Sequence, residues 1–299
     1  MLIQRQLKNT KAPQLLGLAI LSVLVLLYAP VVMFWVEGWI HKNTISTEHE
    51  YFSHGIIGLP FAAYISWTNR KKWRRLPDAN NFLGAAFLLL GGVCYLSGVS
   101  EWVNLSLPMI LTGLCLWFKG IAGLKLQGFP LLLVLLATPT AIPYLIAPYT
   151  LPLQSFIAGT VAFILTQFGI NVTVDGINLY TGGRIVEVAP YCAGLKMMFT
   201  TLYVGLMLLY WTGVLSSRRN SLWFLVLAVL VSISSNILRN TLLTFFHGTG
   251  RDAAFHWLHE GWGGELYSSI MLLLLVPILN LIDKHFSETR IQVDPEREN

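Results

Sequence analysis

The chain has 299 residues, of which 55% are hydrophobic and 12% are charged. Soluble domains carry about 25% charged residues, so this composition excludes an ordinary soluble domain. Several apolar runs approach the ~20 residues that a helix needs to cross a bilayer. The net charge of +5 does not indicate a nucleic-acid partner, because the charges are distributed according to membrane orientation. We therefore expect an all-α polytopic membrane protein that contacts membrane lipid and binds no nucleic acid.

The apolar runs predict about eight transmembrane helices. The expected spans are residues 15–35, 53–67, 82–99, 103–118, 129–147, 192–211, 222–246 and 265–282. The run at 151–169 is also long enough to cross, but Pro148 and Pro152 break its approach and polar residues interrupt it. We expect this run to be a re-entrant or interfacial segment.

The polar stretch at 170–190 alternates apolar and polar residues on either side of two turn signals. These signals are Asp175-Gly176 and Gly182-Gly183. Alternation of period two between such turns is typical of paired strands. We expect a small extracytoplasmic β-hairpin here.

Basic residues set the expected orientation, because cytoplasmic loops are enriched in Lys and Arg. Only five of the 20 lysines and arginines fall outside or within the membrane when both termini are cytoplasmic: Lys42, Arg184, Lys196, Arg239 and Arg251. The expected organisation is a cytoplasmic N-terminus at 1–14, a transmembrane domain at 15–282 and a cytoplasmic, disordered tail at 283–299. The first span is too long for a signal-peptide core, so we expect no cleaved signal.

This topology brings Cys192, Arg239 and His259 to the same depth on the outer side. Cys192 begins a span, Arg239 lies in the outer half of another, and His259 precedes the last. A cysteine in an apolar helix usually serves packing, but the start of a helix favours a thiolate. Gly194 would allow substrate or backbone to approach that thiol closely.

Arg239 is the most unusual residue of its span, since a permanent charge there costs at least ~2.5 kcal/mol. It lies about 10 Å below the end of the span, too deep for its side chain to reach the interface easily. Asn236 and Asn240 are close enough to hold its guanidinium. The alternative is a structural ion pair with a carboxylate such as Glu187 or Glu265.

His259 is a candidate acid and base, because the ordinary pKa of a histidine side chain suits proton transfer near neutral pH. His256 has nearly equivalent spacing, so either imidazole could serve as acid and base. We expect Gly261, Gly263 and Gly264 to give this loop room to reach the thiol. A metal site built on His54, His256 and His259 lacks the tight ligand spacing of zinc motifs, so no metal or cofactor is expected.

A thiol, a guanidinium and an imidazole on one face could carry out acyl transfer. In this hypothesis the thiolate attacks a peptide carbonyl, the imidazole transfers the proton and the guanidinium stabilises the oxyanion. From the residues alone, an equally supported alternative is a transporter or exopolysaccharide-export component. In that case Arg239 and the histidines would line a polar path.

The chain resembles the exosortase/archaeosortase family of multi-pass membrane cysteine transpeptidases. The resemblance covers roughly residues 39–275 and is carried by several motifs in order. They are Tyr51-Phe52-Ser53-His54-Gly55, Phe129-Pro130-Leu131, Pro152-Leu153-Gln154, Gly169-Ile170-Asn171-Val172, Glu187-Val188-Ala189-Pro190-Tyr191-Cys192-Ala193-Gly194-Leu195, Asn236-Ile237-Leu238-Arg239 and His259-Glu260-Gly261-Trp262. Ala193 stands where the family pattern usually has serine, which puts the rate or substrate choice in doubt. The pattern is similar to cyanobacterial members.

The resemblance implies an enzyme of the bacterial inner membrane that processes exported proteins on its extracytoplasmic side. Its substrates would carry a C-terminal sorting tail with a short Pro-Glu-Pro-like motif, a membrane span and a basic end. At the positions that match the motifs of the family, the resemblance implies that Cys192 is the nucleophile, Arg239 the transition-state stabiliser and His259 the acid and base. The supporting residues expected are Glu187, Gly194, Asn236, Asn240, His54 and His256. The acceptor of the acyl group is an unknown glycan or lipid, or water.

Overall fold

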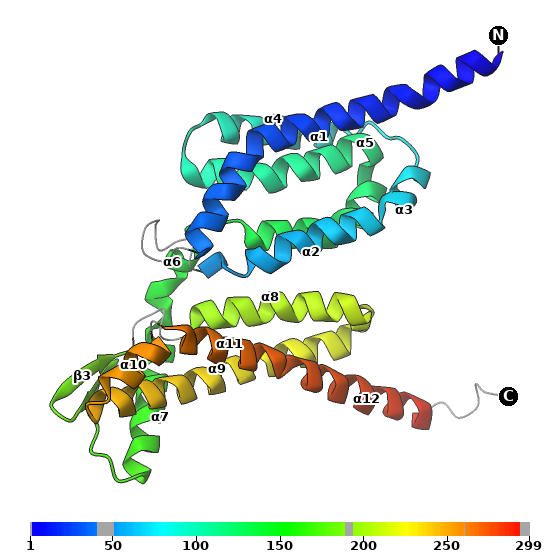
Figure 1. Ribbon diagram of the computed structural model, residues 1–299. Coiled ribbons are helices and arrows are strands. Elements are labelled where there is room, and N and C mark those ends of the chain that lie inside the picture. Colours follow the sequence, from blue (N-terminus) through cyan, green and yellow to red (C-terminus); the bar gives the residue numbers. More distant parts are fainter. Residues whose placement is uncertain (1, 41–50, 189–193, 260, 294–299) are drawn as a thin grey trace. The chain divides into compact units, whose positions relative to one another are not determined.

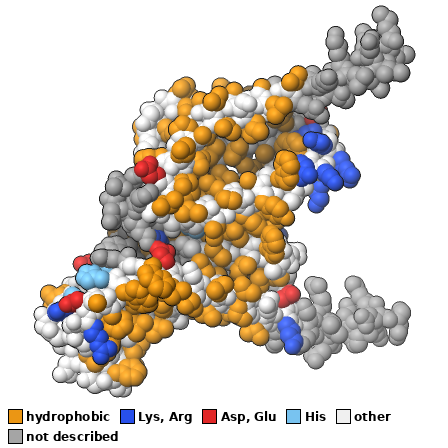
Figure 2. All heavy atoms as spheres, in the orientation of Figure 1, with side chains coloured by type: hydrophobic (Ala, Val, Ile, Leu, Met, Phe, Trp, Pro, Cys, Tyr) orange, Lys and Arg blue, Asp and Glu red, His pale blue; other side chains and the backbone are white. Residues whose placement is uncertain are grey.

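The computed structural model describes residues 2–40, 51–188, 194–259 and 261–293. The chain divides into two compact units, Met1–Thr140 and Ala141–Asn299, which are described separately (Figure 1). Six of the described helices are long and apolar enough to cross a membrane: Gly17–Ile40, Ser100–Ala137, Pro148–Gln167, Leu195–Thr212, Arg218–Gly248 and Trp262–Lys284. Large hydrophobic side chains such as Leu26 and Leu89 are more than 70% exposed, as lipid-facing residues are, and they cover much of the face in Figure 2. The chain is therefore a multi-pass membrane protein.

The described elements of the first unit are all helices, apart from an isolated bridge between Ala79 and Lys119. The unit contains α1 (Leu2–Ile40), α2 (Gly55–Thr68), α3 (Arg70–Arg75), α4 (Phe82–Leu96) and α5 (Ser100–Ala137). Polar groups buried between these helices are paired with one another. The Trp35 indole donates to Asn104 Oδ1 at 2.7 Å, and the Tyr28 and Ser106 hydroxyls lie 2.7 Å apart. Such bonds link helices in an environment that offers no water.

Helix α5 corresponds to the two predicted spans at 103–118 and 129–147. Its two helical arms meet at Gly120, whose φ of 58° and ψ of −152° are not helical. Glycine accepts this conformation because it has no Cβ. The second arm ends at Ala137, ten residues before the predicted end, because Pro139 disfavours helical backbone in the residue before it. The predicted end at residue 147 was therefore wrong.

The second unit contains a bundle of helices and one small sheet. Its helical elements are α6 (Ile142–Ile146), η2 (Ala147–Thr150), α7 (Leu151–Gln167), α8 (Leu195–Thr212), η3 (Val214–Ser216), α9 (Arg218–Gly248), α10 (Asp252–His259), α11 (Trp262–Leu273) and α12 (Leu275–Val293). Helix α12 continues well past Asp283, where the sequence analysis begins a disordered tail. No glycine or proline follows Pro277 within this helix, and Glu, Lys and Arg favour helical backbone.

The sheet is a three-stranded antiparallel meander rather than a single hairpin. Its strands are β1 (Thr173–Asp175), β2 (Asn178–Thr181) and β3 (Arg184–Glu187), in the order β1-β2-β3. The turn between β2 and β3 has a positive φ at both Gly182 and Gly183, as a type I′ turn requires. Both predicted turns are present. The middle strand was missed because the sequence analysis paired the two outer segments directly with each other.

Helix α7 packs its apolar face against the sheet and against α9. The buried residues of this cluster include Ile157, Val161 and Leu165 from α7 and Leu179 from β2, and Phe245 of α9 packs against them. In Figure 1 α7 runs across the direction of α8 and α9. The described helix is continuous, and the re-entrant or interfacial placement of this segment remains a prediction, as does the total of eight spans.

A second cluster joins α8, α9 and α12. Phe224, Leu209 and Leu275 are fully buried in it. This packing fixes α9 as the central helix of the unit, in contact with α7, the sheet, α8, α10, α11 and α12. Residues on α9 are consequently held from several sides.

Candidate functional site

Helix α9 carries a buried polar face through an otherwise apolar span. Ser232, Asn236, Asn240 and Thr244 follow one another at intervals of four residues and are each at most 3% exposed. Residues four apart lie on the same face of a helix. Polar residues buried in a transmembrane helix usually mark a functional interior, so this face is a candidate site.

Arg239 contacts the C-terminal end of α10. Its Nη2 donates to the carbonyl oxygens of Leu258 and His259, both at 3.4 Å. The last carbonyls of a helix lack partners within the helix and carry partial negative charge, so they attract a cation. Arg239 Nε is buried and has no hydrogen-bond partner among the described residues. The guanidinium therefore retains donor capacity beyond its two long contacts.

The predicted alternatives for Arg239 differ from what the structure contains. Within the described residues Arg239 forms no ion pair with a carboxylate, and Glu187 is an exposed residue of β3. The two asparagines do not hydrogen-bond the guanidinium either, and Asn240 Nδ2 donates to the Asn236 carbonyl at 2.9 Å. The supporting role of the two asparagines stays a prediction, and Asn236 lies against another neighbour.

That neighbour is Gly194, the residue that caps the N-terminus of α8. Gly194 has a left-handed backbone, with φ of 85° and ψ of 11°. A Cβ placed there would lie 2.8 Å from Asn236 Cγ and 2.9 Å from its Nδ2. The absent side chain therefore allows the chain that leads into α8 to lie directly on α9, three residues from Arg239. Cys192 itself lies outside the described residues.

His259 ends α10 and is half-buried beside Arg239. Its ring stacks on Phe255, four residues earlier in the helix, with centroids 5.1 Å apart and planes 11° apart. On its other side Phe255 contacts His247 of α9 at 4.9 Å. His256 is exposed and meets Phe255 edge-on at 5.6 Å. Of the two histidines, His259 is the one whose backbone carbonyl accepts a hydrogen bond from Arg239.

The glycines after α10 are sites of close packing. A Cβ on Gly263 would lie 2.5 Å from the Trp257 indole, and one on Gly264 would lie 2.9 Å from the Leu258 carbonyl. That these glycines give His259 room to reach the thiol stays a prediction, because Cys192 lies outside the described residues. They allow α10 and α11 (Trp262–Leu273) to pack against each other with little space between their backbones.

Two sets of contacts at this site were missed by the sequence analysis. The Tyr267 hydroxyl of α11 donates to the Ser235 carbonyl at 2.6 Å, one turn before Arg239. The stacking of Phe255 on His259 is the other. The spacing of four residues would have revealed the second contact if a helix had been expected at 252–259, where the sequence analysis placed a loop.

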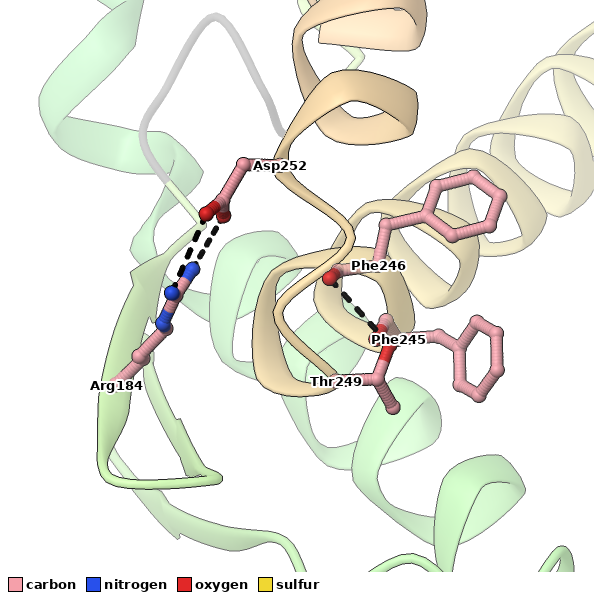
Figure 3. Close-up of polar contacts among 5 residues, drawn as sticks. All are labelled: Arg184, Phe245, Phe246, Thr249 and Asp252. Atoms are coloured by element: carbon pink, nitrogen blue, oxygen red, sulfur yellow. Dashed lines mark hydrogen bonds and ion pairs between the residues drawn. The ribbon is translucent and has the colours of Figure 1, made fainter.

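Arg184 and Asp252 join the sheet to the start of α10 (Figure 3). Arg184 Nη1 donates to Asp252 Oδ1 and Nη2 donates to Oδ2 at 3.3 Å, a bidentate arrangement. The hydrogen bond from Arg184 holds the pKa of Asp252 below its usual value. Next to this pair, a Cβ on Gly182 would overlap the Gly248 carbonyl, so the β2–β3 turn lies directly on the end of α9. The Arg184–Asp252 pair could not be predicted from the sequence, because the two residues are 68 positions apart.

His54 belongs to the first unit. It is 5% exposed, and its Nε2 lies 3.1 Å from the Leu136 carbonyl of α5. This contact joins the start of α2 to the end of α5. Among the described residues no three His, Cys, Asp or Glu side chains gather in a way that could hold a metal ion.

Comparison with known proteins assigns the family. The transmembrane exosortase family matches residues 35–276, which is most of the chain. Members of this family are in general membrane cysteine transpeptidases that act on exported proteins. No curated protein and no solved structure matches the chain. The matched range contains Cys192 and every residue of the Arg239–His259 region, and the chain belongs to the transmembrane exosortase family.

Proposed function

We propose that this protein is a membrane cysteine transpeptidase or protease that removes a C-terminal sorting tail from exported proteins. Cys192 is the nucleophile, Arg239 stabilises the oxyanion and His259 is the acid and base. The observation that carries the proposal is the contact between the Arg239 guanidinium and the His259 carbonyl at 3.4 Å. Residues twenty apart in the sequence meet there, and Gly194 lies against Asn236, three residues before Arg239 on α9.

The chemistry follows from the properties of these groups. The Cys192 thiolate attacks the scissile carbonyl, and a C–S bond forms as the carbonyl oxygen becomes an oxyanion. A guanidinium with unsatisfied donors in a site of low water content is suited to that charge. His259 donates a proton to the leaving amine, and the C–N bond breaks to give a thioester. An acceptor hydroxyl, amine or water then attacks the thioester while His259 takes its proton.

Phe255 contributes to the role proposed for His259. An aromatic ring stacked on an imidazole limits the rotation of that imidazole. His259 in this arrangement can accept a proton without leaving its position beside Arg239. Asn236, Asn240, Glu187 and His54 are supporting residues in this proposal, whereas His256 is exposed on the same helix as His259 and is given no role in the reaction.

The orientation proposed places the end of α9 at the extracytoplasmic face of the inner membrane. Arg218 and Arg219 begin this helix, and Lys and Arg are enriched on the cytoplasmic side. The sheet, α10 and Gly194 then lie at the outer face. The tail of an exported protein, with its own membrane span, would approach the site laterally through the lipid.

The test is a comparison of variants with a tail-bearing exported protein as substrate. Cys192→Ala and Arg239→Ala should each abolish tail removal, and His259→Ala should lower its rate by at least about 100-fold. His256→Ala serves as the matched control, since it changes an imidazole on the same helix, and it should retain most activity. Equal losses for the two histidine variants would contradict the assignment of His259.

A further inference from the structure

The strand β3 forms an open edge of the sheet. Within the described part of the chain, β3 pairs only with β2, and β1 forms the opposite edge. Ile185 of β3 is 58% exposed, and Val174 of β1 is 41% exposed. An unpaired edge presents backbone groups that can pair with another extended chain. The two edges thus offer the same kind of backbone surface.

The register shows which backbone groups of β3 face outward. Thr181 and Arg184 flank a two-residue turn, so they form a hydrogen-bonded pair. Such pairs alternate along an antiparallel ladder, and Val188 N donates to the Ile177 carbonyl at 2.9 Å as this alternation requires. The N–H and C=O groups of Ile185 and Glu187 therefore point away from β2.

Contacts with neighbouring elements hold β3 in position. Its first residue forms the bidentate pair with Asp252, and the preceding turn lies directly on the end of α9. Val188, which follows the strand, is fully buried in the cluster with α7. A strand fixed in this way loses little conformational entropy when a second strand is added. On the opposite edge, Thr173, Val174 and Asp175 of β1 are all exposed, and Val172 before the strand packs against the same cluster.

We infer that the outer edge of β3 is the docking site for the extended segment of the exported protein that precedes or contains the scissile bond. This inference rests on the proposed function. The occupant is a peptide because outward N–H and C=O groups recognise the backbone of an extended chain. The edge belongs to this substrate because β3 precedes the proposed nucleophile closely in the sequence, with five residues from Glu187 to Cys192. β1 lies on the far side of the sheet from β3.

Proline at a single edge position tests the inference. Ile185→Pro removes an N–H that points to the open edge of β3, so no bond within the sheet is lost. Val174→Pro is the matched control, because the pair Val174 and Leu179 makes the N–H of Val174 face outward on β1. The assay is tail removal by the purified, reconstituted protein, with KM and kcat measured separately and the melting temperature of each variant recorded.

The expected result is a rise in KM of at least about fivefold for Ile185→Pro, since one backbone hydrogen bond and the close approach of the peptide are lost. Val174→Pro should leave KM within about twofold. Equal KM values for the two variants would overturn the inference and leave the proposed catalytic function intact. Tail removal that does not depend on Cys192 would instead overturn the proposed function.

A crosslinking measurement tests docking on β3 separately from cleavage by Cys192. It does not require the protein to fold with a proline in the sheet. A photo-crosslinking residue is placed at Ile185 or at Val174 in the Cys192→Ala protein, which is expected to bind the tail without cleaving it. Crosslinking of a tagged tail from position 185 but not from position 174 supports the inference. Equal crosslinking from both positions, or none from 185, overturns it.

Discussion

The substitution Gly194→Ala is the sharpest structural perturbation near the proposed nucleophile. The backbone of Gly194 is left-handed, and an L-residue there costs roughly 1–2 kcal/mol. The added Cβ also meets Asn236 at 2.8 Å, and overpacking of this kind costs about 1–3 kcal/mol. We expect Gly194→Ala to lower the free energy of unfolding by roughly 2–5 kcal/mol, because both terms act at one site.

The other end of the same helix supplies the control. Gly213 caps the C-terminus of α8 with φ of 79°, and nothing lies within 4 Å of a Cβ placed there. Gly213→Ala should therefore cost only the backbone term of roughly 1–2 kcal/mol. Reversible unfolding in mixed micelles measures both variants. The difference between them is the contribution of the contact with Asn236.

A second variant checks that contact directly. In Gly194→Ala combined with Asn236→Ala, the two closest atoms are gone and the nearest remaining one, the Cβ of residue 236, is at 3.1 Å. Part of the lost stability should return relative to the sum of the single changes. Gly194→Ala that is no more destabilising than Gly213→Ala would show that Gly194 does not lie against α9 in the membrane. The proposed placement of Cys192 near Arg239 would then lose its support.

Three further predictions concern the contacts that surround the site. The Arg184–Asp252 pair should stabilise the protein at neutral pH, and this effect should be lost as the pH falls below about 4 and through the lowered pKa of Asp252. The melting temperature of Asp252→Asn should therefore be lower than that of the wild type at pH 7. In acid the two melting temperatures should become equal. Phe255→Leu should lower kcat for tail removal, because the His259 ring loses the neighbour on which it stacks with centroids 5.1 Å apart; an unchanged kcat would contradict the positioning role of Phe255. Tyr267→Phe should lower the free energy of unfolding by about 0.5–1.5 kcal/mol through loss of one hydrogen bond, and a neutral effect in micelles would contradict that bond.

Much of the fold follows from patterns that are local in the sequence. Apolar length predicts the membrane helices, and paired glycines predict the turn at Gly182-Gly183. Local patterns are less informative where tertiary packing decides. The helix Asp252–His259 was taken for a loop because it is short and precedes a run of glycines, yet Trp257 packs on Gly263 and stabilises it. The kink of α5 depends on one glycine whose conformation the sequence does not specify.

At the candidate site, too, the sequence predicts some features, and tertiary packing decides others. The charge of Arg239 within an apolar span marks it as unusual from sequence alone. Its partners could not be predicted, because they are backbone carbonyls nineteen and twenty residues away that any side chain could supply. The neighbour of Asn236 is likewise a glycine, which has no side chain to suggest a contact. Contacts made by backbone groups cannot be predicted from the side chains of the residues that make them.

The central claim is that a thiol at position 192 removes the tail of an exported protein. The most direct measurement is co-expression of a tagged, tail-bearing exported protein with either the wild type or Cys192→Ala, followed by separation on a gel. We expect the tail to be lost only with the wild type. Equal removal by both proteins would contradict the cysteine mechanism and favour a transport role in which Arg239 and the histidines line a polar path.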